Sequence, residues 1–174
     1  MPAREFPFEV REDVLLGDVD TVDRIVTSTN FFDPAEILVA RELVDERLAK
    51  GLASGYHFCF AERDGRVRAY TCFGPIACTR SSWDLYWIAV EDESRNLGIG
   101  RRLLAFTERR IAEFGGTRIY VETSSRDRYL PTRTFYERMG YRIASLLEDF
   151  YAEGDAKVTF VKTLPRECGG LPPL

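Results

Sequence analysis

Apolar residues that recur every three or four positions predict four helices, over residues 17–29, 33–51, 99–114 and 131–140. The second helix has the clearest boundaries. Asp33 and Glu36 form a capping-box pattern at its start, and Gly51 follows its last turn. At the start of the first helix, we expect Asp18 to cap the free backbone amides.

Runs rich in aromatic and β-branched residues predict strands, over residues 6–13, 56–62, 66–74, 82–90, 117–125, 141–151 and 156–164. The pair Asp64-Gly65 joins the second and third runs and is a hairpin signal. The order is one strand, two helices, three strands, then a helix, a strand, a helix and two strands. This order predicts an α/β (α+β) fold, in which a mixed sheet carries helices on both faces. We expect one domain over residues 1–164 and a flexible tail over 165–174.

Composition and charge narrow the function classes. The chain has 174 residues and a net charge of −4, which suits a single domain and does not favour nucleic acid as a partner. No apolar run approaches the roughly 20 residues that a membrane helix needs, and the N-terminal sequence lacks a signal-peptide pattern. We therefore expect a cytoplasmic protein with no membrane partner.

The thiol and imidazole groups do not form a metal-binding pattern. The single histidine is His57, and no CxxC pair occurs among the four cysteines, Cys59, Cys72, Cys78 and Cys168. We expect free buried thiols, a structural role for His57 and no metal site.

The segment RNLGIGRRLL, residues 95–104, holds two glycines at the expected start of the third helix. Backbone amides at a helix N-terminus attract anions, and glycine lets a phosphate approach the backbone closely. An ordinary turn accounts for the two glycines equally well. A Rossmann dinucleotide site fits less well, because residue 103 is leucine where that fingerprint has a third glycine.

The longer string WIAVEDESRNLGIGRRLL resembles the acetyl-CoA motif of the GNAT N-acetyltransferase superfamily, and FYERMGY resembles the family's second signature. The resemblance covers residues 8–164 and implies a GNAT-type, mostly antiparallel sheet with acetyl-CoA as co-substrate. It implies that the pantetheine arm enters a gap beside the central strand and pairs there with the backbone of Ile88, Ala89 and Val90. It also implies a pyrophosphate loop made of Arg95, Asn96, Leu97, Gly98, Ile99, Gly100, Arg101 and Arg102.

The same resemblance suggests which residues carry the chemistry. Tyr136, which precedes Gly140 by one turn, matches the tyrosine that protonates the leaving thiolate. Asp84 and Glu122 match carboxylates that act as the base in different members. A base is needed because a free amine with a pKa of about 10 is mostly protonated at neutral pH. The alternatives are a packing tyrosine and salt-bridged carboxylates, and Tyr129 stands where the family often has asparagine.

An acidic and aromatic segment, residues 146–155, suits a cationic acceptor, and the alternative is a solvated hairpin tip. The residues expected to bind the acceptor are Ser124, Glu148, Asp149 and Tyr151. The resemblance implies that the acceptor is the primary amine of a small molecule or a protein, and it also allows a homodimer. We thus expect an acetyl-CoA-dependent N-acetyltransferase. Two alternatives remain open, namely a non-catalytic acyl-CoA-binding domain with a regulatory or interaction role and an unrelated nucleotide-binding protein.

Overall fold

One seven-stranded sheet runs through the computed structural model of the chain, which describes residues 7–165. Its strands are β1 (Glu9–Arg11), β2 (His57–Arg63), β3 (Arg66–Pro75), β4 (Ser82–Val90), β5 (Arg118–Ser124), β6 (Arg142–Ala152) and β7 (Asp155–Thr163). They lie in the order β1-β2-β3-β4-β5-β7-β6, and every neighbouring pair is antiparallel except β4 with β5. The predicted mixed, mostly antiparallel sheet is confirmed. The predicted tail lies, from residue 166 on, outside the described residues.

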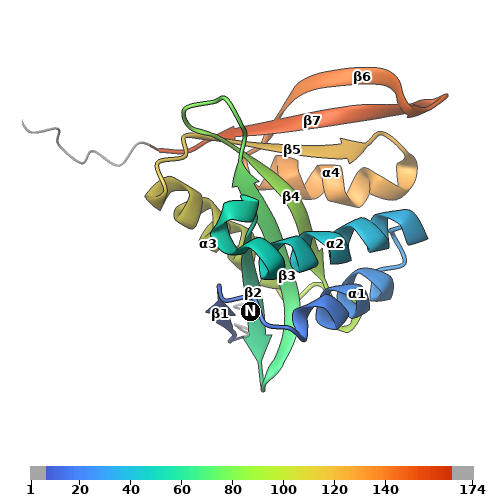
Figure 1. Ribbon diagram of the computed structural model, residues 1–174. Coiled ribbons are helices and arrows are strands. Elements are labelled where there is room, and N and C mark those ends of the chain that lie inside the picture. Colours follow the sequence, from blue (N-terminus) through green and yellow to red (C-terminus); the bar gives the residue numbers. More distant parts are fainter. Residues whose placement is uncertain (1–6, 166–174) are drawn as a thin grey trace, which may run out of the picture.

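Helices cover the sheet on both faces (Figure 1). They are α1 (Asp18–Ser28), α2 (Pro34–Lys50), α3 (Ile99–Glu113) and α4 (Leu130–Arg138), with short 3-10 turns η1 (Gly51–Ser54), η2 (Asp92–Ser94) and η3 (Asp127–Tyr129). α1 and α2 pack on one face through buried residues such as Val22 and Val44. α3 and α4 pack on the other face through buried residues such as Leu103 and Tyr136. Within residues 7–165, no helix has the length and apolar character needed to cross a bilayer.

The first two helices differ in how their N-termini are satisfied. In α2 the Asp33 carboxylate accepts the Glu36 amide at 2.9 Å, and the Glu36 carboxylate accepts the Asp33 amide at 2.8 Å. The predicted capping box is therefore confirmed. In α1 the prediction that Asp18 is the cap is wrong, because Gly17 occupies that position. The buried Asp18 carboxylate instead pairs with Arg11 at 2.8 Å, which ties α1 to β1.

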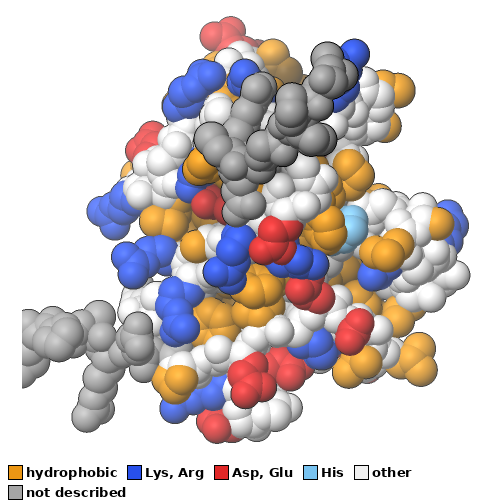
Figure 2. Space-filling model, turned by 90° about the vertical axis from the view of Figure 1, so that its left-hand side faces the viewer, with side chains coloured by type: hydrophobic (Ala, Val, Ile, Leu, Met, Phe, Trp, Pro, Cys, Tyr) orange, Lys and Arg blue, Asp and Glu red, His pale blue; other side chains and the backbone are white. Residues whose placement is uncertain are grey.

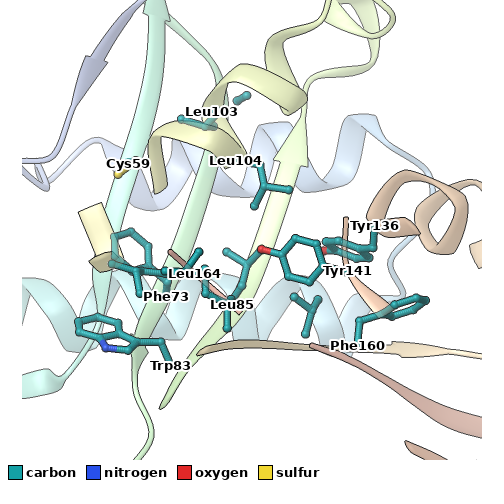
Figure 3. Packing of buried hydrophobic residues seen from close by; sticks show 14 of the residues in the cluster. Cys59, Phe73, Trp83, Leu85, Leu103, Leu104, Tyr136, Tyr141, Phe160 and Leu164 are labelled. Atoms are coloured by element: carbon teal, nitrogen blue, oxygen red, sulfur yellow. The ribbon is translucent and has the colours of Figure 1, made fainter. Parts of the chain in front are cut away.

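The core on the face of α3 and α4 is rich in aromatic side chains. Figure 3 shows Trp83 and Phe73 at one end of this cluster and Tyr136, Tyr141 and Phe160 at the other. Leucines from β4 and α3 fill the middle. Because protein interiors pack as densely as organic crystals, this cluster holds α3 and α4 in fixed positions on the sheet.

The histidine and thiols lie mostly where the sequence predicts. His57 packs against three aromatic rings and burial lowers its pKa, which agrees with a structural role. Cys59 and Cys72 are buried free thiols as predicted. Cys78 is exposed, contrary to the prediction, because it lies in the turn between β3 and β4 with a φ of 63°. Cys168 is outside the described residues, and within residues 7–165 no three His, Cys, Asp or Glu groups gather as metal ligands would.

A buried carboxylate secures the end of β4. Glu91 is 3% exposed and contacts the guanidinium groups of Arg24, Arg66 and Arg68. Burial by itself raises the pKa of Glu91, but the arginines outweigh burial and hold that pKa below its ordinary value. The cluster joins α1 and β3 to the chain just before the glycine loop.

Surface charge on one side of the molecule is mixed. Figure 2 shows Lys and Arg side chains interspersed with Asp and Glu over the face that lies at the left of Figure 1. Charges of opposite sign at such short spacing largely cancel at a distance. Long-range attraction of a polyanion to this face is therefore weak.

Removing the charge of Glu91 should destabilise the fold. Glu91→Gln leaves three guanidinium groups around a neutral side chain, and we expect the free energy of unfolding to fall by about 2 to 3 kcal/mol, since the arginines are partly exposed. The exposed neighbour Glu93 offers a control, and Glu93→Gln should change stability by less than about 0.5 kcal/mol. Urea unfolding followed by circular dichroism measures both. Wild-type stability in Glu91→Gln would contradict the anchoring role.

Candidate active site

The parallel strands β4 and β5 pair over a short stretch and then diverge. Their three residue pairs are Ser82–Arg118, Trp83–Ile119 and Asp84–Tyr120. Beyond these pairs β4 continues to Val90 and β5 to Ser124. The edge of residues 85–90 that faces β5 therefore carries backbone groups that β5 does not satisfy, and Figure 1 shows the two strands running apart. A ligand with amide groups can pair with such an edge as an added strand.

The glycine loop follows β4 and begins α3. Asn96 and Gly98 have φ values of 60° and 77°, in the left-handed region, so the chain turns sharply before the helix. The Arg102 amide donates to the Gly98 carbonyl at 3.2 Å, and among the described residues no side chain caps this terminus. The amides of residues 99–101 thus have no partner within the helix, which is the arrangement that binds anions.

Gly100 lets the start of α3 approach two other elements. A Cβ atom built at this position would lie 3.3 Å from Val90 at the end of β4 and 3.9 Å from Phe135 of α4. The helix terminus therefore lies beside the open end of β4, where Ala89 is buried and Ile88 is half-buried. It also lies beside the helix that carries Tyr136. The predicted pantetheine strand, pyrophosphate loop and general acid are thus brought together.

The arginines of the loop have different surroundings. Arg95 donates to the Thr29 carbonyl at 3.3 Å and pairs with Asp92 at 3.2 Å, so it holds the loop against the end of α1. The Arg102 guanidinium lies over the Phe8 ring, and Arg101 is exposed on the first turn of α3. The exposed residues of the loop are Asn96, Leu97, Gly98, Arg101 and Arg102.

The two carboxylates predicted as bases lie on one face of the sheet, at the divergence. Asp84 is the register partner of Tyr120, and alternate residues of β5 share a face, so Glu122 lies on the same side. Burial, and then the charge of Glu122, raises the pKa of half-buried Asp84 to about 6, while Lys157 opposes the rise. Glu122 is half exposed and pairs with Lys157 at 2.9 Å. Within the described chain Asp84 has no ion-pair partner of its own.

A turn and two tyrosines cover Asp84 from one side. Its partner on β3 is Gly74, where a Cβ atom would lie 2.3 Å from the carbonyl oxygen of Gly55. The chain after η1 therefore lies directly on the sheet beside Asp84. Tyr86 is close as well, since burial and then the charge of Asp84 raise the pKa of Tyr86 to about 12, and Tyr56 packs edge-on against it at 5.5 Å. This cover explains the partial desolvation of the carboxylate.

Tyr136 projects from α4 into the aromatic cluster. It is 4% exposed, and its ring packs against Tyr141 and Phe160 at 5.5 and 5.7 Å between centroids. Burial raises the pKa of its hydroxyl, so the group keeps its proton at neutral pH and can donate it. The position is compatible with both roles that the sequence leaves open, packing and proton donation.

Lys162 of β7 holds α3 and α4 together. Its Nζ donates to the Glu108 carboxylate of α3 at 2.7 Å and to the Met139 carbonyl at the end of α4 at 2.8 Å. Tyr141 lies beside the same carboxylate, and burial, followed by the charge of Glu108, raises its pKa. This contact fixes the end of α4 one turn from Tyr136, although nothing in the sequence signatures points to Lys162.

Two of the predicted acceptor-binding residues take part in turns. The Ser124 hydroxyl donates to Asp155 at 2.5 Å, and Asp155 pairs with Arg126 at 2.9 Å. The Asp149 carboxylate accepts a backbone amide of the β6–β7 turn at 2.7 Å. Both side chains thus have structural partners, and their contact with an acceptor stays a prediction.

The other two predicted residues lie toward open solvent, one of them beside the carboxylates. Glu148 is exposed on β6. Burial, and then the charges of Glu122 and Asp155, raises the pKa of Tyr151, which places its hydroxyl near Glu122. Sequence reasoning missed Lys157, which pairs with Glu122. The sequence patterns carry no signal for this pair, because it depends on β7 lying beside β5, where Lys157 is opposite Ser124.

Comparisons with known proteins agree with this architecture. A family model described as the acetyltransferase (GNAT) domain matches residues 54–143. An uncharacterized N-acetyltransferase of Methanocaldococcus jannaschii is 34% identical over 126 residues, which are 71% of this chain and 78% of that protein. A crystal structure from Desulfovibrio desulfuricans, assigned to the GNAT acetyltransferases, is 43% identical with a TM-score of 0.89, over 90% of this chain and 99% of its own. An aminoglycoside 6′-N-acetyltransferase complexed with coenzyme A shares the fold, with 20% identity and a TM-score of 0.72 over 91% of this chain and 98% of its own.

The sequence match and the geometry concern the same residues. The matched stretch contains β4, the glycine loop and Tyr136, and around Gly100 the end of β4 and the start of α3 lie beside Phe135, the neighbour of Tyr136 on α4. The chain therefore belongs to the GNAT family and is an acetyl-CoA-dependent N-acetyltransferase.

Proposed function

We propose that this enzyme acetylates a primary amine by direct attack of the amine on the thioester, with Asp84 as general base and Tyr136 as general acid. The contrast between the two carboxylates carries the proposal. Asp84 lies at the divergence of β4 and β5 with a pKa raised to about 6, whereas Glu122 is paired with Lys157. A base with a pKa near the working pH is mostly ionised and still binds a proton well. Glu122 attracts and orients the cationic acceptor.

The chain's own groups suit acetyl-CoA, which supplies the activated acyl carbon. The backbone of Ile88, Ala89 and Val90 pairs with the amides of the pantetheine arm, because β5 leaves that edge open. The amides at the start of α3 hold the pyrophosphate, since they lack helical partners. Arg101 adds positive charge there, and Arg95 acts by holding the loop in place.

The proton balance follows from these roles. Asp84 accepts a proton from the acceptor ammonium group, directly or through water, and the neutral nitrogen forms a bond to the thioester carbon. The carbon–sulfur bond then breaks and its electron pair goes to sulfur. Tyr136 gives its proton to the sulfur and recovers one that the nitrogen releases, so that an amide and a free thiol result. The remaining proton leaves Asp84 for solvent.

The acceptor side suits a cationic amine. Asp84 and Glu122 supply negative charge, and the aromatic faces of Tyr86 and Tyr151 attract ammonium groups. One structural neighbour is an aminoglycoside 6′-N-acetyltransferase, and aminoglycosides are small molecules that carry several amino groups. An amine of a protein is the other acceptor class.

A panel of amines tests the proposal. Aminoglycosides, polyamines, amino acids and peptides are incubated with acetyl-CoA, and the free thiol is measured. We expect turnover with at least one member that carries several positive charges. Tight calorimetric binding of CoA without turnover on any member would favour a non-catalytic acyl-CoA-binding domain instead.

Two exposed arginines on α3 form a matched pair for locating the pyrophosphate. Arg101 is in the first turn and Arg109 lies two turns farther along the helix. Arg101→Glu should weaken CoA binding at least about 10-fold, or about 1.4 kcal/mol, because it places a negative charge beside the phosphates. Arg109→Glu should change it less than about twofold. Calorimetry measures both, and equal affinities would move the pyrophosphate away from this terminus.

The raised pKa of Asp84 predicts a distinctive pH profile. As pH falls through about 6, wild-type kcat/KM should fall because the carboxylate becomes protonated. Asp84→Asn should lower kcat/KM by about 10² at neutral pH, and the loss should shrink toward pH 10 as the amine loses its own proton. Glu122→Gln should give a smaller loss at neutral pH and should move the acid limb of the profile to lower pH, because the charge of Glu122 helps to raise the pKa of Asp84. The opposite pattern in the two variants would exchange their roles.

The hydroxyl of Tyr136 can be removed without removing its ring. Tyr136→Phe should lower kcat about 10-fold or more while CoA affinity and the circular dichroism spectrum persist. A thiolate is a fairly stable leaving group, so the loss should lie at the low end for general acids. Steady-state kinetics with the amine found in the panel measures it. A wild-type kcat would leave Tyr136 as a packing residue.

A further inference from the structure

One of the chain's own primary amines lies beside the two carboxylates of the acceptor side. The chain has 21 arginines and three lysines, namely Lys50, Lys157 and Lys162. Of these two kinds of side chain, only lysine offers an amine that can lose its proton and react, because the arginine guanidinium group stays charged. The Lys157 Nζ atom contacts the Glu122 carboxylate at 2.9 Å. The enzyme therefore holds an amine of the class that it acetylates next to its own site.

The Lys157 side chain is directed along the sheet toward Asp84. Its backbone is opposite Ser124 of β5, but its Nζ atom pairs with Glu122, which is two residues closer to the level of Asp84. One more step of two residues, about 7 Å, separates Glu122 from Tyr120, the register partner of Asp84. Burial, and then Glu122, raise the pKa of Asp84, and Lys157 opposes this rise, which agrees with its proximity.

The surroundings of the Nζ atom limit its contact with solvent. It lies 4.1 Å from the centre of the Phe150 ring, and the Lys157 side chain is 15% exposed. Such surroundings slow the reaction of the amine with reagents that arrive from solvent. The four-carbon stem of lysine is flexible, so rotation about its bonds can carry Nζ from Glu122 toward an acetyl group bound in the site.

The expected path of acetyl-CoA leads its thioester to the same place. In the proposed function, the pyrophosphate lies at the start of α3, which follows β4, and the pantetheine arm runs from there back along residues 88–90. The thioester is at the far end of that arm, so it comes toward Asp84, where β4 and β5 part. The Lys157 amine, the base and the acyl carbon thus converge on one opening.

We propose that the enzyme acetylates its own Lys157 when it holds acetyl-CoA and no acceptor. Asp84 takes a proton from the Lys157 ammonium group, directly or through water, and the neutral nitrogen forms a bond to the thioester carbon. The carbon–sulfur bond breaks and its electron pair goes to sulfur. Tyr136 gives its proton to the sulfur and recovers one from the nitrogen. The products are N-acetyl-lysine, free CoA thiol and one proton that Asp84 releases to solvent.

This modification changes the acceptor side. Acetylated Lys157 is neutral, so it no longer forms an ion pair with Glu122, and that carboxylate becomes free to bind a cationic acceptor. The inference rests on the proposed function, because self-acetylation uses the same base and the same acid.

Peptide mass spectrometry of the full chain tests the proposal. The protein is incubated with acetyl-CoA and no other amine, and acetylation is followed at each lysine. Acetyl-Lys157 should form at least about 10-fold faster than acetyl-Lys50, although the Lys50 side chain, at the end of α2, is 58% exposed. Lys162 pairs with Glu108 on the opposite face and should stay unmodified. N-hydroxysuccinimidyl acetate, which needs no enzyme, should instead modify Lys50 first.

Two variants and a dilution show whether the transfer takes place within one molecule at the site. Asp84→Asn should slow the acetylation of Lys157 at least about 10-fold, because the base is lost. Lys157→Arg keeps a positive charge beside Glu122, and the fast gain of one acetyl group by the intact protein should disappear. In the wild type, about tenfold dilution should leave the rate per molecule unchanged. Circular dichroism verifies that both variants are folded.

The possible results separate this inference from the proposed function. Equal rates at Lys157 and Lys50, or a rate at Lys157 that Asp84→Asn leaves unchanged, overturn self-acetylation at the site. An unmodified Lys157 in protein that turns over an amine of the panel overturns self-acetylation and leaves the proposed function standing. If neither Lys157 nor any amine is acetylated, both fail.

Discussion

The separation of β4 from β5 after three residue pairs is the constraint on which the site depends. Parallel strands that stay paired satisfy each other's backbone and leave no edge for a ligand. Here β5 pairs with β7 along its whole length, from Arg118–Thr163 to Ser124–Lys157, and follows β7 away from β4. The gap therefore opens where β4 stays paired with β3 up to Val90 while β5 stays paired with β7. Asp84, in the last pair, lies where the two directions part.

A gap of this kind needs supports at both sides, and they come from side chains outside the sequence signatures. On one side, Glu91 and its three arginines fix the end of β4 to α1 and β3. On the other, Lys162 joins α3 to α4 through Glu108 and the Met139 carbonyl. Gly100 then allows α3 to lie against both β4 and α4. The uncapped helix terminus and Tyr136 thus occupy fixed places around the same opening.

Local chemistry made much of the fold predictable from the sequence. The capping box of α2, the bounds of β4 at residues 82–90 and the Asp64-Gly65 turn, with φ values of 53° and 71°, rest on interactions between residues close in the chain. The prediction for Asp18 failed because its carboxylate is taken by Arg11, a tertiary contact that capping preferences ignore. Lys157 was missed for a related reason. Its pairing with Glu122 requires that β7, and not β6, lies beside β5.

The sequence pattern of a strand also does not show whether the strand contains a β-bulge or whether other elements cover its faces. The register of β3 with β4 shifts between Cys72 and Phe73. Tyr86 therefore departs from the regular alternation of side chains between the two faces, and it lies near Tyr56 and Asp84. A two-residue period cannot reveal such a shift. The pattern of β6 predicts a strand correctly, but apolar residues on both faces usually mean burial. Only the placement of the helices shows that neither face is covered.

Partial burial has opposite effects on the two groups that exchange a proton. Desolvation favours the neutral form of each, so it raises the pKa of Asp84 and lowers that of an ammonium group beside it. When both groups are exposed to water, the pKa of the aspartate is about 4 and that of the ammonium group is about 10, so proton transfer to the carboxylate is unfavourable. Burial of both groups raises the lower pKa and lowers the higher one, so the difference between the two pKa values becomes smaller. The charge of Glu122 helps to raise the pKa of Asp84 but also holds the ammonium in its charged form, and its pairing with Lys157 moderates both effects. A buried Asp84 beside a neutralised Glu122 therefore favours proton removal more than two free carboxylates would.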